Sequence, residues 1–336
     1  MQGQRIVFTA PNQVELQLFD LDLDQLAPDE VIIQVSHSLI SPGTELACLR
    51  GTESWARLPF VPGYAGCGKV LAVGSAVQDV RIGERVFSYT KHASIAPARV
   101  LIAPLPEGLD PVKACFARMA AVSITALRVS AAELGDYVAV IGLGLVGNLC
   151  AQLFALAGCE VIGLDLSPAR CEAARKCGIR HVIEAGEQDA KAFIADLTHG
   201  AMCQTVVEAI GAPAVGARAA ELAGKLGEVI LLGSPRGAYQ GDITTLLNQV
   251  HLWGNGCITF KGAHEWRYPT KRDPNGQVKH SIERNVEILL HLIADGRLHV
   301  EELLTHVLPP NRCAEAYAGL RDNKDRYMGV VFDWTS

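Results

Sequence analysis

The hexapeptide Gly142-Leu143-Gly144-Leu145-Val146-Gly147 is the feature that most constrains what this 336-residue chain can fold into. It follows the apolar run YVAVI (137–141) and precedes the helical pattern NLCAQLFALAG (148–158). In that setting the first glycine permits a tight turn, the second lets the backbone approach a pyrophosphate, and the third allows close helix–strand packing. The helix N-terminus favours the negative charge of the phosphates. The motif therefore predicts a dinucleotide site formed by Gly142, Gly144, Leu145, Val146 and Gly147.

An acidic residue, Asp165, follows Gly147 by 18 residues, at the end of the apolar run EVIGL (160–164). A carboxylate there accepts hydrogen bonds from the adenosine ribose hydroxyls and repels a 2′-phosphate, which favours NAD over NADP. Arg170 is close enough in sequence to bind a 2′-phosphate instead, so NADP is the less favoured alternative. The motif could also be a strand–turn–helix that needs glycine only for packing, with Asp165 as a turn residue.

Short β-type runs alternate with Ala-rich helical segments through the middle of the chain. The runs begin near 137, 160, 181, 204 and 227, and segments 169–178 and 212–227 have helical spacing between them. This alternation predicts parallel βαβ units and a doubly wound sheet, that is, an α/β fold. The uncharged stretch 137–159 is long enough to span a membrane, but its four glycines favour a strand, a turn and a buried helix.

The two ends of the chain have a different pattern of apolar residues from the middle. Apolar runs at 14–23, 30–40, 68–77 and 83–89 predict a β-rich domain. The tail holds an amphipathic helical pattern (281–296) and a last strand, VVFDW (330–334), which we expect to return to the N-terminal domain. The predicted division is thus 1–121 with 266–336 as one domain, and 122–265 as an inserted dinucleotide-binding domain.

Charge and cysteine content narrow the class of protein. A net charge of −6 argues against a nucleic-acid or anionic-membrane partner. The N-terminal sequence lacks the apolar region of a signal peptide, so we expect a cytoplasmic protein. The ten cysteines include no CxxC pair, which predicts thiols used mainly as small apolar residues and no zinc ribbon.

Taken together, the order of these parts resembles the medium-chain dehydrogenase/reductase superfamily. The resemblance includes PGYAGCGKVLAVGSAVQDVRIGERVF (62–87) and VSITAL (122–127), where Thr125 matches a threonine that packs near the nicotinamide. It implies a GroES-like β-rich catalytic domain joined to a Rossmann domain, and a homodimer or homotetramer in which the strand around 258–260 pairs edge to edge. The segment ISPGTE (40–45) resembles a zinc-lacking branch that includes the bacteriochlorophyllide dehydrogenase-like proteins.

The resemblance also locates the positions where zinc-dependent relatives hold their catalytic metal. Pro42 stands at the first cysteine ligand, and Gly63-Tyr64-Ala65 replaces a Gly-His-Glu segment. The segment 119–126, which would supply the remaining ligand, has no Cys, His, Asp or Glu. These residues are poor zinc donors, so we expect no metal. A site rebuilt from Cys48, Cys67 and His37 is the less favoured alternative.

Without zinc, a side chain must move the hydroxyl proton during hydride transfer. Thr44 matches the hydroxyl that relays the proton in the family, and Tyr64 takes the vacated histidine position. A nearby cation would help Tyr64 to ionise, and Lys91 and His92 are the candidates, their alternative being a solvated loop pair. Glu45 is expected to orient a neighbour or pair with a cation, unless it is a surface carboxylate.

A basic segment after the last predicted strand of the inserted domain offers a possible substrate contact. His264, Glu265, Arg267, Lys271 and Arg272 could cap a cleft for a polar or anionic group, but a solvated loop is the favoured interpretation.

The leading hypothesis is an NAD-preferring, zinc-independent enzyme that interconverts a small polar alcohol, such as a sugar or cyclitol, and its carbonyl. The hydroxyethyl group of a tetrapyrrole is a second substrate class, through the subgroup resemblance. The rivals are an NADPH-dependent reductase of enones or quinones and a cofactor-binding protein without turnover.

Overall fold

The computed structural model describes residues 1–23 and 26–336, and its chain forms two compact units. Unit 1 consists of Met1–Arg118 and Pro269–Ser336, and unit 2 of Met119–Tyr268. The domain boundaries expected at 122 and 265 lie a few residues inside those of unit 2.

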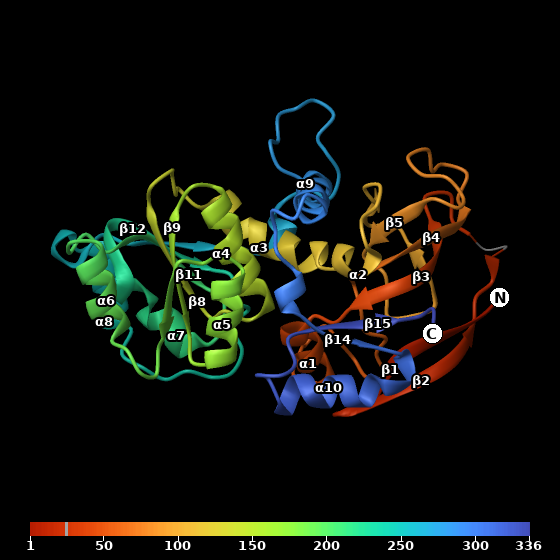
Figure 1. Cartoon of the computed structure of the whole chain (residues 1–336), viewed down its shortest axis with the longest axis horizontal. Coiled ribbons are helices and arrows are strands. Elements are labelled where there is room, and N and C mark those ends of the chain that lie inside the picture. The colour runs from red at the N-terminus through yellow and green to blue at the C-terminus, as the bar shows by residue number, and fades with distance from the viewer. Residues whose placement is uncertain (24–25) are drawn as a thin grey trace. The chain divides into compact units, whose positions relative to one another are not determined.

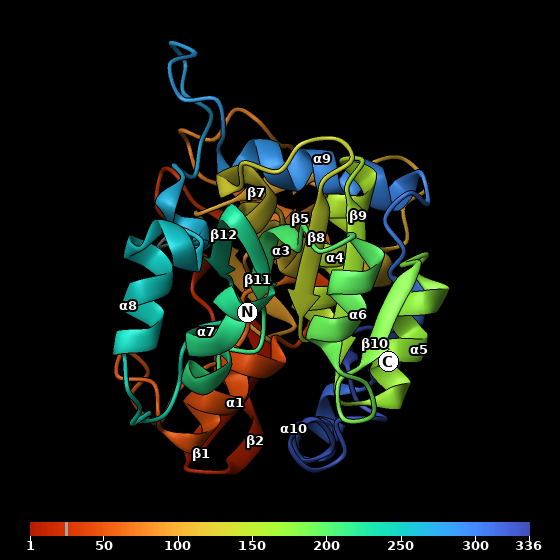
Figure 2. The ribbon, with the colours of Figure 1, turned by 90° about the vertical axis from the view of Figure 1, so that its left-hand side faces the viewer.

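Unit 2 is built on a parallel six-stranded sheet. Its strands are β8 (Tyr137–Ile141), β9 (Glu160–Asp165), β10 (His181–Glu184), β11 (Cys203–Glu208), β12 (Ala223–Leu231) and β13 (Thr259–Gly262). Their order in the sheet is β10-β9-β8-β11-β12-β13, and the strands from β12 to β9 can be followed across Figure 2. The predicted doubly wound α/β fold is confirmed, and β8 and β11 meet at its centre, where the strand order reverses.

Helices cover both faces of this sheet, because successive strand residues point to opposite sides. Val138 and Val140 of β8 pack with residues of α3 (Ala117–Val129), α4 (Leu145–Leu156) and α5 (Pro168–Lys176). Ala139 between them packs on the other face with α6 (Ala190–Leu197) and a 3-10 turn at Ala219–Leu222. Figure 1 shows α4 and α5 on one side of the sheet and α6, α7 (Pro213–Arg218) and α8 (Thr244–His251) on the other.

The uncharged stretch 137–159 contains β8 and α4, as the glycines predicted. No helix in the part of the chain that the structure describes is both long and apolar enough to cross a membrane.

The predicted helix over 212–227 is wrong in its second half. Helix α7 and the 3-10 turn end at Leu222, and Ala223 already pairs with Cys203 of β11. Alanine-rich composition favours a helix, but sheet pairing outweighs it here. A Cβ on Gly224 would stand 2.3 Å from the carbonyl oxygen of Ala201, so only glycine permits these two backbone segments to approach so closely.

Unit 1 contains a seven-stranded sheet and a β-hairpin. The hairpin is β1 (Gln2–Ala10) with β2 (Gln13–Asp20). The sheet has the order β14-β15-β3-β4-β5-β7, with β6 on β3; the strands are β3 (Val31–Leu39), β4 (Gly66–Val73), β5 (Arg85–Ser88), β6 (Ile95–Ala98), β7 (Ile102–Pro104), β14 (Leu304–Leu308) and β15 (Gly329–Asp333). The C-terminal strand β15 pairs antiparallel with β3, which confirms its expected return to the N-terminal region.

Helices of unit 1 include α1 (Pro42–Arg50), α2 (Pro111–Ala114), α9 (Ile282–Ala294) and α10 (Cys313–Asp322). The predicted amphipathic helix 281–296 is α9, which Ser281 caps by accepting a hydrogen bond from the Arg284 N–H. Helices α1 and α10 share a core with β1 and β15, in which Phe8, Leu46, Tyr317 and Phe332 meet. The sequence did not lead us to expect β14, α1 or α10.

The ten cysteines are free thiols, nine of them buried, and Cys257 is partly exposed. Burial raises the pKa of several of them, to about 11 for Cys159 and about 12 for Cys203. The prediction that they serve mainly as small apolar residues is confirmed.

Candidate functional site

The glycine loop between β8 and α4 has the form that a pyrophosphate requires. Gly142 has φ +94°, a value that side chains disfavour, and a Cβ on Gly147 would lie 1.7 Å from the Gly142 carbonyl oxygen. A Cβ on Gly144, by contrast, would meet only the Arg170 Nη1 at 3.8 Å. The protein itself therefore has room for a side chain at Gly144, and the space beside it is left for a ligand.

Helix α4 presents its N-terminus to that space. Gly144 is the N-cap and offers no side chain to the first helical N–H groups, which in Leu145, Val146 and Gly147 have no partner within a helix. Such groups, with the helix dipole, attract a phosphate. The residues fit a nicotinamide dinucleotide, which supplies hydride acceptance in oxidation and hydride donation in reduction.

Asp165 lies at the carboxyl end of β9, beside the glycine loop. Its Oδ2 accepts a hydrogen bond from the Leu143 N–H at 2.7 Å, and its Oδ1 accepts one from the Ser167 N–H at 2.9 Å. Each carboxylate oxygen can accept a second bond, so ribose hydroxyls still have acceptors here. The Arg170 Nη1 is 3.7 Å from Oδ2, and the buried Arg170 Nε has no hydrogen-bond partner. An arginine placed this way is compatible with either cofactor.

Thr125 is fully buried in α3, and its hydroxyl donates to the Ala121 carbonyl at 3.1 Å. Its neighbour Ser123 is 2.8 Å from the Val146 carbonyl oxygen, which ties α3 to the first turn of α4.

Tyr64 lies in unit 1, just before β4, and is half-buried as a residue. Its hydroxyl is hydrogen-bonded by the side chains of Ser41 and Thr44, at the start of α1. Desolvation by burial raises the pKa of Tyr64, Arg118 opposes this, and the negative charge of Glu45 adds to it. Tyr64 is thus a neutral phenol near pH 7, suited to donate a proton.

The Arg118 guanidinium lies between two aromatic rings. Its central carbon is 4.7 Å from the Tyr64 ring centroid and 4.5 Å from that of Tyr89, and the residue is only 6% exposed. Cation–π contacts of this kind contribute about 0.5–2 kcal/mol each. They hold a permanent positive charge against Tyr64.

Glu45 is buried at the centre of a hydrogen-bond network, so its interpretation as a surface carboxylate is wrong. Its Oε1 accepts from the Ser41 N–H at 2.8 Å, and its Oε2 accepts from the Tyr317 hydroxyl at 2.5 Å. The His92 Nε2 is 3.1 Å from the same Oε2. Three donors therefore compensate the burial of this carboxylate.

His92 is also fully buried, which excludes the solvated-loop alternative for this residue. Its Nδ1 lies 2.8 Å from the Ser38 hydroxyl oxygen, which accepts from the Trp334 Nε1–H at 2.9 Å. If Ser38 donates to Nδ1, then Nε2–H donates to Glu45 and every proton has one acceptor. The network thereby places a proton on His92 Nε2, facing Glu45.

Lys91, next to His92, is exposed as a whole, although its ammonium lies 5.1 Å from the Phe60 ring centroid. Desolvation around that group lowers the pKa of Lys91, and Glu45 acts in the opposite direction. The cation that acts on Tyr64 is Arg118, so the expectation that Lys91 and His92 supply this charge is not supported.

The alternative metal residues are brought together only in part. His37 and Cys67 are paired across β3 and β4, but Cys48 packs in the apolar core with Ile6, and the His37 Nε2 lies 3.6 Å from Asp333. Among residues 1–23 and 26–336, no group of three His, Cys, Asp or Glu side chains is arranged to hold a metal ion.

The basic segment after β13 behaves as a surface loop. His264, Arg267, Lys271 and Arg272 are exposed, and Lys271 and Arg272 form ion pairs with Glu283 and Glu287 of α9. Glu265 is the exception, since it is buried.

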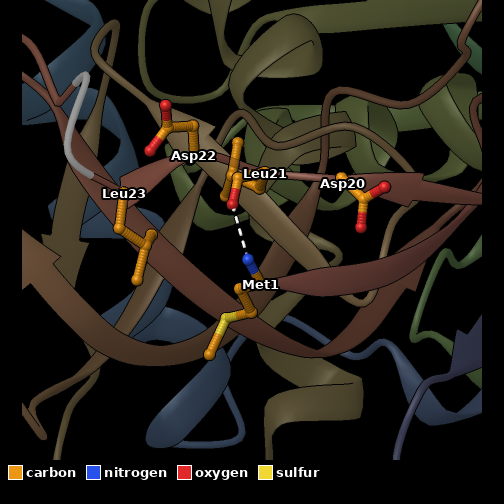
Figure 3. Close-up of a pocket in the computed structure, with 5 residues that line it drawn as sticks. All are labelled: Met1, Asp20, Leu21, Asp22 and Leu23. Atoms are coloured by element: carbon orange, nitrogen blue, oxygen red, sulfur yellow. Dashed lines mark hydrogen bonds between the residues drawn. The ribbon is translucent and has the colours of Figure 1, made fainter.

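A hollow of about 540 Å³ opens at the end of the β1–β2 hairpin (Figure 3). It is lined by Met1, Asp20, Leu21, Asp22 and Leu23, and the Met1 ammonium donates to the Leu21 carbonyl at 2.8 Å. None of the predicted site residues lines it.

The contacts around Glu45, Tyr64 and His92 form one network in unit 1. The sequence analysis missed six of its members: Ser38, Ser41, Tyr89, Arg118, Tyr317 and Trp334. Arg118 had a recognisable signal, because it is the one charged residue between Lys113 and Arg128 in an apolar helical stretch. Tyr317 had none, since its partner Glu45 is 272 positions away.

Two family models match this chain. Residues 27–103 match the alcohol dehydrogenase GroES-like domain, and residues 146–268 match a domain described as zinc-binding dehydrogenase. Together they span more than half of the sequence. The chain belongs to the medium-chain dehydrogenase/reductase superfamily. Within it, the chain is an NAD(P)-dependent oxidoreductase of the alcohol dehydrogenase type.

Similar proteins cover nearly the whole chain at low identity. An uncharacterized zinc-type alcohol dehydrogenase-like protein of Haemophilus influenzae is 21% identical and covers 97% of each chain. D-arabitol-phosphate dehydrogenase of Enterococcus avium is 24% identical and covers 92% of this chain and 91% of its own. The solved structure of galactitol-1-phosphate dehydrogenase from Escherichia coli superimposes with a TM-score of 0.84 at 18% identity, over 98% of this chain and 99% of its own, which establishes the shared fold.

Proposed function

We propose that this protein is a zinc-independent, NAD(H)-preferring oxidoreductase that interconverts a polar secondary alcohol and its carbonyl. The observation that carries the proposal is the hydrogen-bonded Tyr64 hydroxyl, held by Ser41 and Thr44 and flanked by Arg118. A phenol with a raised pKa donates a proton to a carbonyl oxygen as hydride arrives at the carbon, and takes the proton back in the oxidation. Thr44 is the proposed relay hydroxyl, and Glu45 and His92 fix the α1 turn that carries it.

The substrate class is proposed to be sugars, sugar alcohols or cyclitols. Two of the similar proteins are named for polyol phosphates, D-arabitol phosphate and galactitol 1-phosphate. A panel of polyols, their phosphates and a hydroxyethyl tetrapyrrole, each assayed with NAD⁺ and NADP⁺, tests this. Turnover of enones or quinones with NADPH, but of no alcohol, would favour the rival reductase, and cofactor binding without any turnover would favour the rival binding protein.

The proton-transfer role of Tyr64 is tested by Tyr64→Phe. We expect kcat to fall by about 10²-fold or more, with NADH affinity unchanged. Tyr327→Phe is the matched control, because the Tyr327 hydroxyl is 3.5 Å from Glu315 and outside the network. Full activity of Tyr64→Phe would remove Tyr64 from the mechanism.

Zinc independence is supported by the residue types at the positions that hold the metal in zinc relatives, Pro42, Tyr64 and Ala65. Metal analysis of tag-free protein is expected to find well under one zinc per chain. Stoichiometric zinc that a chelator removes together with activity would contradict the proposal.

We further propose a homodimer formed through β13, the edge strand of the unit 2 sheet. Exposed apolar side chains gather in the neighbouring sequence, with Leu247 55% and Trp253 62% exposed. Light scattering is expected to give twice the chain mass, and Trp253→Glu is expected to give monomers. A monomeric parent protein would reject this assembly. The cytoplasmic location stays a prediction.

A further inference from the structure

We propose that Arg118 supplies the fixed positive charge that stabilises the Tyr64 phenolate during proton transfer, replacing the electrostatic part of a catalytic metal's role. This inference rests on the proposed function of Tyr64. It makes Arg118 a positioning residue that acts through Tyr64 on the substrate.

The geometry supports a direct electrostatic contact. The guanidinium carbon lies 4.7 Å from the Tyr64 ring centroid, and Tyr89 covers the guanidinium at 4.5 Å. With Arg118 only 6% exposed, water screens this charge little. A guanidinium also keeps its charge at every pH at which a phenol titrates.

The charged and titratable groups that act on Tyr64 come from three helices, α1, α3 and α10. Arg118 on α3 favours the phenolate, whereas Glu45 on α1 and Tyr317 on α10 interact unfavourably with a negative charge there. The Ser41 and Thr44 side chains hydrogen-bond the phenolate-forming oxygen. In this set Arg118 is the cation whose charge opposes the effect of burial on the pKa of Tyr64.

The chemical step balances without a metal. In oxidation the substrate O–H bond breaks and a Tyr64 O–H bond forms, which consumes the phenolate. The electron pair left on the substrate oxygen becomes the second bond of the carbonyl, and the carbinol C–H pair leaves as hydride, which an oxidised nicotinamide bound at the glycine loop would accept. In reduction Tyr64 gives up its proton, and Arg118 stabilises the phenolate that remains.

The test is a titration of Tyr64 that does not depend on turnover. Tyrosinate absorbance is recorded against pH for each protein with and without Tyr64→Phe, and the difference isolates Tyr64 from the other six tyrosines. Arg118→Met is expected to raise the Tyr64 midpoint by about one pH unit or more. Arg118→Lys, which keeps the charge, should stay closer to the parent. Arg99→Met removes an exposed arginine and should change nothing.

Arg118→Gln is the second neutral variant and keeps a planar polar group if the methionine variant does not fold. An unchanged Tyr64 midpoint in a folded neutral variant would overturn the inference. If alcohols are turned over, the pH profile of their oxidation should shift with the midpoint; a fall in rate without that shift would assign Arg118 a purely structural role. If no alcohol is turned over, the absorbance titration still decides the role of Arg118, while the proposed function fails separately.

Discussion

An added methyl group should have different effects at two glycines of the β8–α4 loop: at Gly147 it should lower stability, and at Gly144 it should lower cofactor affinity. Gly147→Ala places a Cβ 1.7 Å from the Gly142 carbonyl oxygen. The contact must open by more than about 1 Å, and helix α4 and strand β8 are both packed in the core, so overpacking should cost about 3 kcal/mol. At about 2–4 °C per kcal/mol, the melting temperature of unit 2 should fall by about 6–12 °C.

Gly144→Ala should leave the fold nearly unchanged. Its φ of −62° and ψ of −176° are open to any residue, and the nearest atom to the new Cβ is the Arg170 Nη1 at 3.8 Å. The loss of a glycine N-cap costs up to about 1 kcal/mol, which the lower entropy of the unfolded chain offsets by about 0.4–1 kcal/mol. The melting temperature should therefore move by no more than about 2–4 °C.

Cofactor affinity should separate the two variants most clearly. If the pyrophosphate approaches the Gly144 backbone, the new methyl group occupies its place, and NADH affinity should fall at least tenfold, or about 1.4 kcal/mol. The assay is a titration of NADH fluorescence, beside thermal unfolding followed by circular dichroism. Gly216→Ala in α7 is the control, because its Cβ meets only Leu231 at 3.6 Å. Unchanged NADH affinity in Gly144→Ala would refute the reasoning.

Other changes test the acid at β9, the buried network and the phenol. Asp165→Asn keeps the shape but removes the charge, so the ratio of NADH to NADPH affinity should fall about tenfold; an unchanged ratio would mean that Arg170 or the backbone sets the preference. Tyr317→Phe deprives buried Glu45 of a donor and should lower the free energy of unfolding by about 1–3 kcal/mol in urea titrations, against no change in Tyr327→Phe. Because the pKa of Tyr64 is raised, alcohol oxidation should increase with pH into the alkaline range and carbonyl reduction should decrease; two flat profiles would exclude Tyr64 as the titrating group.

The sequence predicted best what local patterns encode. Gly142 and Gly147 are needed for a turn and for close packing between residues that are near in sequence. The alternation of strands and helices repeats five times, so the doubly wound fold could be predicted from the sequence. The return of the terminal apolar run to the N-terminal region was also predicted, and it is seen in the pairing of β15 with β3.

The unit 1 network could be predicted only in part, because long-range contacts make it. Thr44, Glu45 and Tyr64 were found through a family resemblance at matching positions. The burial of Glu45 depends on α10, an element whose sequence carries little signal. The failure at 212–227 has the same origin, since pairing with β11, at Ala223 and again from Glu228, outweighs local helix propensity there.

The cysteines are distributed so that their reactivity with a thiol reagent would report the unfolding of each unit. Nine thiols are shielded in the two units and one, Cys257, is partly open. A thiol reagent should therefore modify a single site quickly in the folded protein, and the rest only as each unit opens. Because Cys150, Cys171 and Cys203 belong to unit 2 whereas Cys48, Cys67 and Cys313 belong to unit 1, mass spectrometry of the labelled peptides would measure the opening of each unit separately. Protection of the unit 2 thiols by added NADH would then give the cofactor's binding energy without any substrate.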